Sequence, residues 1–162
     1  MMLLMTIMAA LAMISCALVG GVFFAFSSFV MKALARVSPP GGLEAMQAIN
    51  IVVLNRSFLG LFMGTAAVSL LVAALAASQW QAPSSLWLLA GAASYLGGTF
   101  METGLGNVPL NDQLARLSPG DPTAAADWSH YIHRWTRLNT LRTIGAVFAA
   151  LCFTIGLILL AR

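Results

Sequence analysis

Charge is what this sequence lacks most: only 8% of its 162 residues are charged, whereas 60% are hydrophobic. Soluble domains carry about 25% charged residues, so this chain has too few to cover a surface that faces water. The shortage excludes an ordinary soluble domain. It also excludes a nucleic-acid-binding surface, because the chain has no basic stripe of the kind that a phosphate backbone requires. The composition predicts an integral membrane protein.

The runs without any charge mark the expected membrane spans. Residues 1–31, 57–101 and 143–161 contain no charged side chain, and a transmembrane helix needs about 20 apolar residues. The middle run is long enough for two spans, and the polar stretch Ser78–Ser85 divides it. We therefore expect an all-α fold, a four-helix transmembrane bundle that forms a single domain over residues 1–162. Its helices are predicted at Leu4–Val30, Ser57–Ala77, Pro83–Leu105 and Asn139–Leu160.

The two long connections should contain short amphipathic helices. Leu43–Asn55 has a helix-forming composition, and Pro109 can start a second short helix. Asp121 can cap, and Pro122 can open, a last helix of about 40 residues, whose first turns project beyond the bilayer or lie in the interface. In the second span, Gly60 and Gly64 form a small-xxx-small pair, which most often indicates close helix packing.

Cysteine is nearly absent, and this excludes two further classes. Cys16 and Cys152 both lie in apolar helices, so we expect neither a disulfide framework nor a metal cluster. His130 and His133 lack further ligands in a suitable pattern, so no metal site is predicted. The first segment lacks a positively charged leader and is longer than the apolar part of a secretory signal. We interpret it as a membrane span.

The basic residues predict the orientation. Seven of the eight Lys and Arg residues lie in the two connections on one side of the predicted bundle. The positive-inside rule then places both connections in the cytoplasm and both termini outside. For a bacterial protein this would be the cytoplasmic (inner) membrane. These residues are Lys32, Arg36, Arg56, Arg116, Arg134, Arg137 and Arg142.

One face of the last helix carries aromatic, amide and basic residues. At 100° per residue, this face holds Trp128, Tyr131, Trp135, Asn139 and Arg142. The opposite face holds His130, His133 and Arg137. Such a face is typical of an aromatic belt at headgroup depth. It also fits the wall of a pocket, because an arginine and an amide at the mouth of a span normally face the bundle interior. Both interpretations stay open.

Glu102 is the single acidic residue in any predicted span. A charge at mid-bilayer costs about 2.5–3.5 kcal/mol on insertion scales. Glu102 should therefore pair with Arg142 or Arg56, or act as an acid or base. On a helical count it shares a polar stripe with Tyr95, Thr99 and Gly106.

Four segments together resemble a known family. They are FSSFVMKAL at Phe26–Leu34, AMQAINIVVLN at Ala45–Asn55, NVPLNDQL at Asn107–Leu114, and the series from Trp128 to Arg142. Over nearly its whole length the chain resembles the anthrone oxygenase-like membrane family. The resemblance implies a four-helix membrane protein, and the named fungal members oxidise anthrones to anthraquinones with O₂ and no evident cofactor. The matching polar positions are Asn50, Asn55, Asn107, Asn111, Trp128, Tyr131, Trp135, Asn139 and Arg142.

The chemistry that this resemblance implies needs a base, donors for an enolate oxygen, and an apolar pocket for a flat aromatic molecule and O₂. As catalytic residues we expect Glu102 for the proton and Arg142, Asn139 and Asn107 for the oxyanion. As substrate-binding residues we expect Trp128, Tyr131, Trp135, Asn50, Asn55, Asn111 and Ser27. On this view the protein is a cofactor-free monooxygenase with no metal.

A second interpretation gives the same residues a structural role. Amides and aromatic rings also join helices in membranes, as in a non-catalytic accessory subunit or a lipid- or quinone-binding component of a larger membrane complex. Expected partners are membrane lipid, a hydrophobic aromatic small molecule, and a second copy or a larger complex. A cavity that fits a tricyclic ligand would favour the enzyme. A filled core would favour the subunit.

Overall fold

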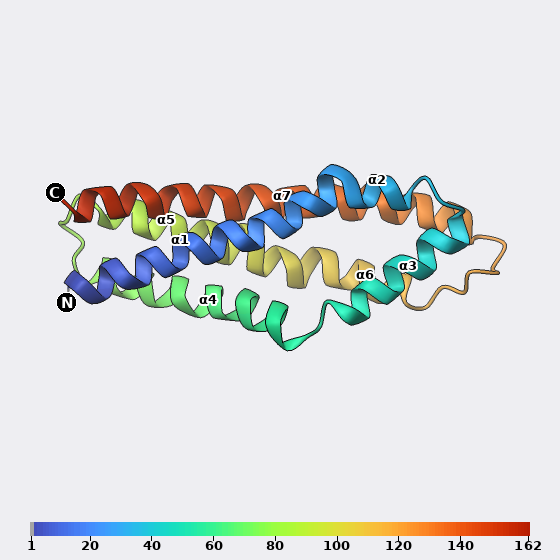
Figure 1. Cartoon of the computed structure of the whole chain (residues 1–162), viewed down its shortest axis with the longest axis horizontal. Coiled ribbons are helices and arrows are strands. Elements are labelled where there is room, and N and C mark those ends of the chain that lie inside the picture. Colours follow the sequence, from blue (N-terminus) through green and yellow to red (C-terminus); the bar gives the residue numbers. More distant parts are fainter. Residues whose placement is uncertain (1) are drawn as a thin grey trace.

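Four long helical rods lie side by side along the longest axis of the molecule (Figure 1), in a computed structural model that describes residues 2–162. The first rod joins α1 (Met2–Ala25), the π-helical segment η1 (Phe26–Val30) and α2 (Met31–Leu34). After α3 (Pro39–Val52), the second rod is α4 (Arg56–Ala77). The third joins α5 (Ser85–Tyr95), η2 (Leu96–Met101), η3 (Thr103–Asn107) and α6 (Val108–Leu114). The fourth is α7 (Ala124–Leu160).

The predicted four-helix bundle is confirmed. The helices Met2–Leu34, Arg56–Ala77 and Ala124–Leu160 are each long and apolar enough to cross a membrane, which fits an integral membrane protein. The third rod completes the bundle, although its π-helical turns divide it into shorter elements. Pro109 lies in the first turn of α6, as expected.

Small residues let the rods approach closely in the apolar core. The core of α1, α4, α5 and α7 combines alanines with phenylalanines and one buried tyrosine. A Cβ atom added at Gly145 of α7 would lie 2.8 Å from the backbone carbonyl carbon of Gly98. Ser94 donates to the Gly145 carbonyl at 2.8 Å, and Thr99 donates to the Arg142 carbonyl at 3.0 Å. The third rod and α7 are therefore in backbone contact just beside Glu102 and Arg142.

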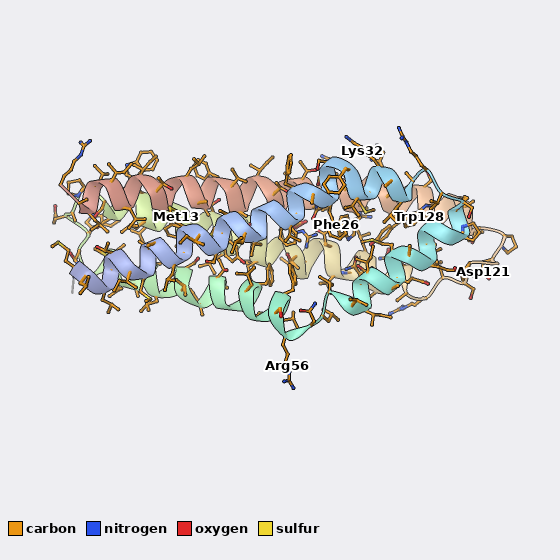
Figure 2. The ribbon with its side chains drawn as sticks, viewed as in Figure 1. Met13, Phe26, Lys32, Arg56, Asp121 and Trp128 are labelled. Carbon is orange, nitrogen blue, oxygen red and sulfur yellow. The ribbon has the colours of Figure 1, made fainter. Side chains whose placement is uncertain are left out.

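A second core fills the end of the bundle that carries the basic residues, where α2, α3 and α6 surround the first turns of α7 (Figures 1 and 2). A Cβ atom at Gly42 would lie 2.8 Å from the Trp128 indole and from the Leu34 carbonyl oxygen, so α3 lies directly against both. Gln47 donates to the carbonyls of Leu114 and Leu117 and so satisfies the end of α6. The helices α3 and α6 of the two long connections are thus packed against the bundle.

Two local predictions are wrong. Gly60 and Gly64 are exposed, and a Cβ atom at either would meet nothing within 4 Å, because α4 turns its Phe62 and Thr65 side toward the bundle instead. Asp121 accepts from the Ser118 amide at 3.0 Å and closes a turn. It does not cap the last helix, which begins at Ala124.

Candidate functional site

π-helical turns occur on both rods that face Arg142. The Met31 N–H bonds to the Phe26 carbonyl, and the Val108 N–H bonds to the Thr103 carbonyl, so both bonds span five residues. π-turns are rare and frequently occur at functional sites. Entering such a turn also releases a helix carbonyl, and the Phe23 carbonyl before η1 accepts a bond from the Asn139 amide.

Arg142 is buried, with 5% of its surface exposed. Its guanidinium carbon lies 4.2 Å from the centre of the Phe23 ring and 5.3 Å from that of Trp135. Nη1 donates to Thr103 Oγ1 at 3.2 Å and Nη2 donates to Asn139 Oδ1 at 2.7 Å. Nε is buried and has no partner. The arginine is held by two hydrogen bonds and two rings, and its Nε–H has no partner.

The Asn139 side chain forms hydrogen bonds that position Arg142. Its Nδ2 donates to the Phe23 carbonyl and to Ser27 Oγ, both at 2.7 Å, and its Oδ1 accepts from Arg142. Both donor hydrogens and one acceptor site are therefore used. Its expected role in holding an oxyanion stays a prediction, and in this structure neither donor hydrogen is free. The side chain ties α7 to η1 and orients the guanidinium.

Glu102 does not form the expected ion pair. Within residues 2–162, no carboxylate oxygen lies within 4.0 Å of a Lys or Arg nitrogen, so direct pairing with Arg142 or Arg56 is absent. Glu102 Oε1 is buried and has no partner. The carboxylate folds back over its own helix, where a Cβ atom on Gly106 would lie 2.7 Å from Oε2 and would also overlap Oε1. The glycine therefore makes room for the carboxylate.

Asn107 contributes an acceptor to the site. Its side chain is 1% exposed, and Nδ2 donates to the Trp135 carbonyl at 3.2 Å. Its Oδ1 is buried without a partner. The bond to Trp135 uses one of the two amide hydrogens, and the expected role of Asn107 in holding an oxyanion stays a prediction. Buried polar atoms without partners are rare in native proteins, and each costs about 1–3 kcal/mol. Three such atoms belong to Glu102, Asn107 and Arg142, on the third rod and on the helix α7 that packs against it.

Trp128, Tyr131 and Trp135 form a continuous stack that leads to Arg142. The ring centres are 5.7 Å apart between Trp128 and Tyr131 and 6.4 Å apart between Tyr131 and Trp135. Asn111 Oδ1 accepts from the Tyr131 hydroxyl at 2.9 Å and from Trp135 Nε1 at 2.8 Å, and so orients both rings. Burial raises the pKa of the Tyr131 hydroxyl, so it remains a neutral donor.

The predicted faces of the last helix are confirmed. The five residues of the aromatic and polar face are all buried, whereas His130, His133 and Arg137 are exposed. The interpretation as a lipid-facing aromatic belt is therefore wrong for these rings.

Of the remaining expected site residues, two lie at or near this cluster and one lies apart from it. Ser27 joins the cluster through Asn139, and the half-buried Asn50 lies beside the Tyr131 hydroxyl with an unpartnered Nδ2. Asn55 lies apart from it. It is exposed and caps α4, since it accepts from the Phe58 amide at 3.0 Å.

Sequence reasoning missed Phe23, Thr103 and the π-turns. Thr103 accepts from Arg142 and donates to the Thr99 carbonyl at 2.7 Å. The glycine-rich run Gly97–Asn107 was the available signal, because four glycines within a span are unusual for a regular helix.

The space beside Arg142 is lined by further rings. Phe23 lies 6.3 Å from both Phe58 and Phe62, and Phe62 stacks on Phe100 at 5.4 Å. Of two surface grooves, one lies at the end of α3 beside Asn55, and neither is lined by Glu102 or Arg142. The other, between the first rod and α7, is lined in part by Ser27.

Comparison with known proteins gives a family match. A family model described as "Anthrone oxygenase" matches residues 55–152, which include α4, the third rod and most of α7. No curated protein and no solved structure matches the chain.

Proposed function

The chain belongs to the anthrone oxygenase family, and we propose on that premise that it oxidises a lipophilic phenolic or anthrone-like molecule with O₂ in the membrane, without a cofactor. One observation carries the proposal. Arg142 on α7, and Glu102 and Asn107 on the third rod that packs against it, each have a buried side-chain nitrogen or oxygen atom without a partner. A phenolic or enolate ligand supplies the missing partners.

The reaction balances with O₂ as the only oxidant. A base removes a proton from the methylene carbon of the anthrone and leaves an enolate. The enolate transfers an electron to O₂, and the radical pair combines to a carbon-bound peroxide. Protonation of the peroxide and loss of water convert the methylene group to a carbonyl. One O₂ is consumed, and one water and one quinone form.

We assign the roles from the contacts. Arg142 Nε binds the enolate oxygen, because a fixed donor in a dry site stabilises developing negative charge. Glu102 takes the methylene proton through its free Oε1. Asn107 Oδ1 accepts from a phenolic hydroxyl of the substrate. Asn139 positions Arg142.

Entry of a flat substrate requires the ring layer to move. Phe58 and Phe100 are half-buried, whereas Phe23 and Phe62 are buried. We propose that Phe58 and Phe100 rotate and that the substrate stacks between the remaining rings. Because the substrate is lipophilic, it would enter from the bilayer.

The test is oxygen uptake by the purified, metal-free protein with a panel of anthrones and hydroquinones. We expect uptake above the uncatalysed rate for at least one anthrone, with one quinone formed per O₂. The Arg142→Gln protein, matched for folding by circular dichroism, should return to the uncatalysed rate. No uptake across the panel would refute the proposal.

A second candidate function is supported by the same ring layer. Phe62 and Phe100 already stack beside the site, as expected of the filled core of an accessory subunit. Under that function the protein would co-purify with a larger membrane complex and would consume no oxygen. Oxygen uptake supports the enzyme, whereas co-purification with a complex without uptake supports the subunit. Both can be measured on one preparation.

A further inference from the structure

A groove of about 360 Å³ lies between the first rod and α7. Its membrane side holds Ser27 and Thr140, and its wall includes Lys32, His133, Thr136 and Arg137. Neither Glu102 nor Arg142 lines it, and Ser27 is the residue that it shares with the buried cluster.

Along the bundle axis, the groove lies at the depth expected for the lipid headgroups. Lys32 is the first charge after the charge-free residues 1–31, and the last helix is charge-free from residue 143 onward. The groove therefore begins where both helices leave the apolar layer. Lys32 extends from the outer side of α2 (Figure 2).

The chemistry of the groove suits a phosphate. Lys32 and Arg137 provide two cations, His133 adds a ring nitrogen, and no acidic residue lines the groove. Basic grooves between transmembrane helices on one side of a bilayer bind anionic headgroups.

A hydroxyl on one of the groove-lining residues lacks a partner. Thr136 Oγ1 is buried and unpartnered, whereas Thr140 Oγ1 donates to Ser27 Oγ at 3.0 Å or to the Thr136 carbonyl at 2.8 Å. Rotation of the Thr136 side chain would turn this hydroxyl toward the groove, where a phosphate oxygen would accept from it. Most of the lining is apolar, which suits the glycerol and the first acyl carbons.

We propose that this groove binds the headgroup phosphate of an anionic phospholipid. The ligand would touch Ser27, which accepts from Asn139, which in turn accepts from Arg142. A bound lipid thereby adjoins the hydrogen bonds that hold the arginine.

The experiment measures lipid binding to the purified full chain in non-ionic detergent by native mass spectrometry. The probes are dioctanoyl phosphatidylglycerol, dioctanoyl phosphatidylcholine and inorganic phosphate. We expect phosphatidylglycerol to bind more tightly than phosphatidylcholine. Lys32→Gln with Arg137→Gln should weaken phosphatidylglycerol binding at least tenfold, since each cation contributes about fivefold.

The matched control is Arg116→Gln with Arg134→Gln, which removes the same charge from two residues outside the groove. It should leave the affinity within about twofold. Thr136→Val keeps every charge and should also weaken binding. Equal binding of both lipids, or equal losses in the groove and control proteins, would overturn the proposal. Displacement of the lipid by inorganic phosphate at equal concentration would overturn it in favour of a free-phosphate site.

Discussion

The guanidinium carbon of Arg142 lies 4.2 Å from the centre of the Phe23 ring, and this contact joins the last helix to the first at the entrance of a π-helical turn. A desolvated cation–π contact contributes about 2 kcal/mol. It neutralises no charge, and Glu102 forms no direct ion pair. The site therefore keeps a positive charge and an unused donor, which suits an anionic ligand such as an enolate.

Arg142→Lys should abolish activity although the charge is kept. Lysine cannot bond to Asn139 and Thr103 together while it lies flat between two rings. We expect kcat to fall by at least ~100-fold, measured as oxygen uptake. Arg134→Lys, at an exposed position of the same helix, should stay within about twofold. Similar losses in both proteins would contradict the role of Arg142.

Glu102→Gln separates proton removal from binding. A general base contributes about 10²–10⁴-fold to the rate, so kcat should fall within that range. The substrate affinity, measured by quenching of tryptophan fluorescence, should change by less than about threefold. The control is Glu44→Gln, because Glu44 is exposed on α3. Unchanged kcat in Glu102→Gln would exclude this carboxylate as the base.

Gly106→Ala should displace the Glu102 carboxylate without removing it. The new methyl group would overlap the carboxylate oxygens, which end a flexible side chain, so the fold should persist while kcat falls about tenfold or more. Gly104→Ala is the matched control in the same segment, because nothing lies within 4 Å of its Cβ position. Combining Gly106→Ala with Glu102→Gln should add no further loss. Additive losses would show that Gly106 acts elsewhere.

Asn111→Leu should destabilise the second core. It leaves the Tyr131 hydroxyl and Trp135 Nε1 without their shared acceptor. Each unsatisfied buried donor costs about 1–3 kcal/mol, so the free energy of unfolding should fall by about 2–6 kcal/mol in a detergent denaturation series. Asp112→Asn changes the exposed next residue and should stay within about 0.5 kcal/mol. A loss in Asn111→Leu no larger than in this control would contradict the network.

The orientation is tested by labelling single cysteines in intact membranes. Ser38→Cys and Ser118→Cys lie in the two basic connections, and Gln81→Cys lies in the short connection at the opposite end. The native cysteines Cys16 and Cys152 are buried and should label weakly. The positive-inside rule predicts that an impermeant thiol reagent added outside labels Gln81→Cys alone. Labelling of Ser38→Cys and not Gln81→Cys would reverse the orientation.

The four rods and the buried face of the last helix could be predicted from the sequence. Both depend on properties of single residues and on the spacing of residues a few positions apart. The cost of placing charge in hydrocarbon is local, so the charge-free runs predicted the four rods. A helical period of 3.6 residues is also local, so the buried face from Trp128 to Arg142 was predicted and is observed. The functional role of that face is still a prediction.

The tertiary structure decided what depends on neighbours distant in sequence. The backbone contact between Gly98 and Gly145 fixes how the third rod and α7 are aligned, and no single-sequence pattern contains that contact. The third rod contains π-turns on both sides of Glu102, and its carboxylate lies over Gly106 without a direct pair to Arg142. Likewise, the Asn139 amide donates to the Phe23 carbonyl and the Asn107 amide donates to the Trp135 carbonyl, and both acceptors are distant in sequence. A hydrogen bond depends on position in space, whereas a sequence pattern records only the residue type.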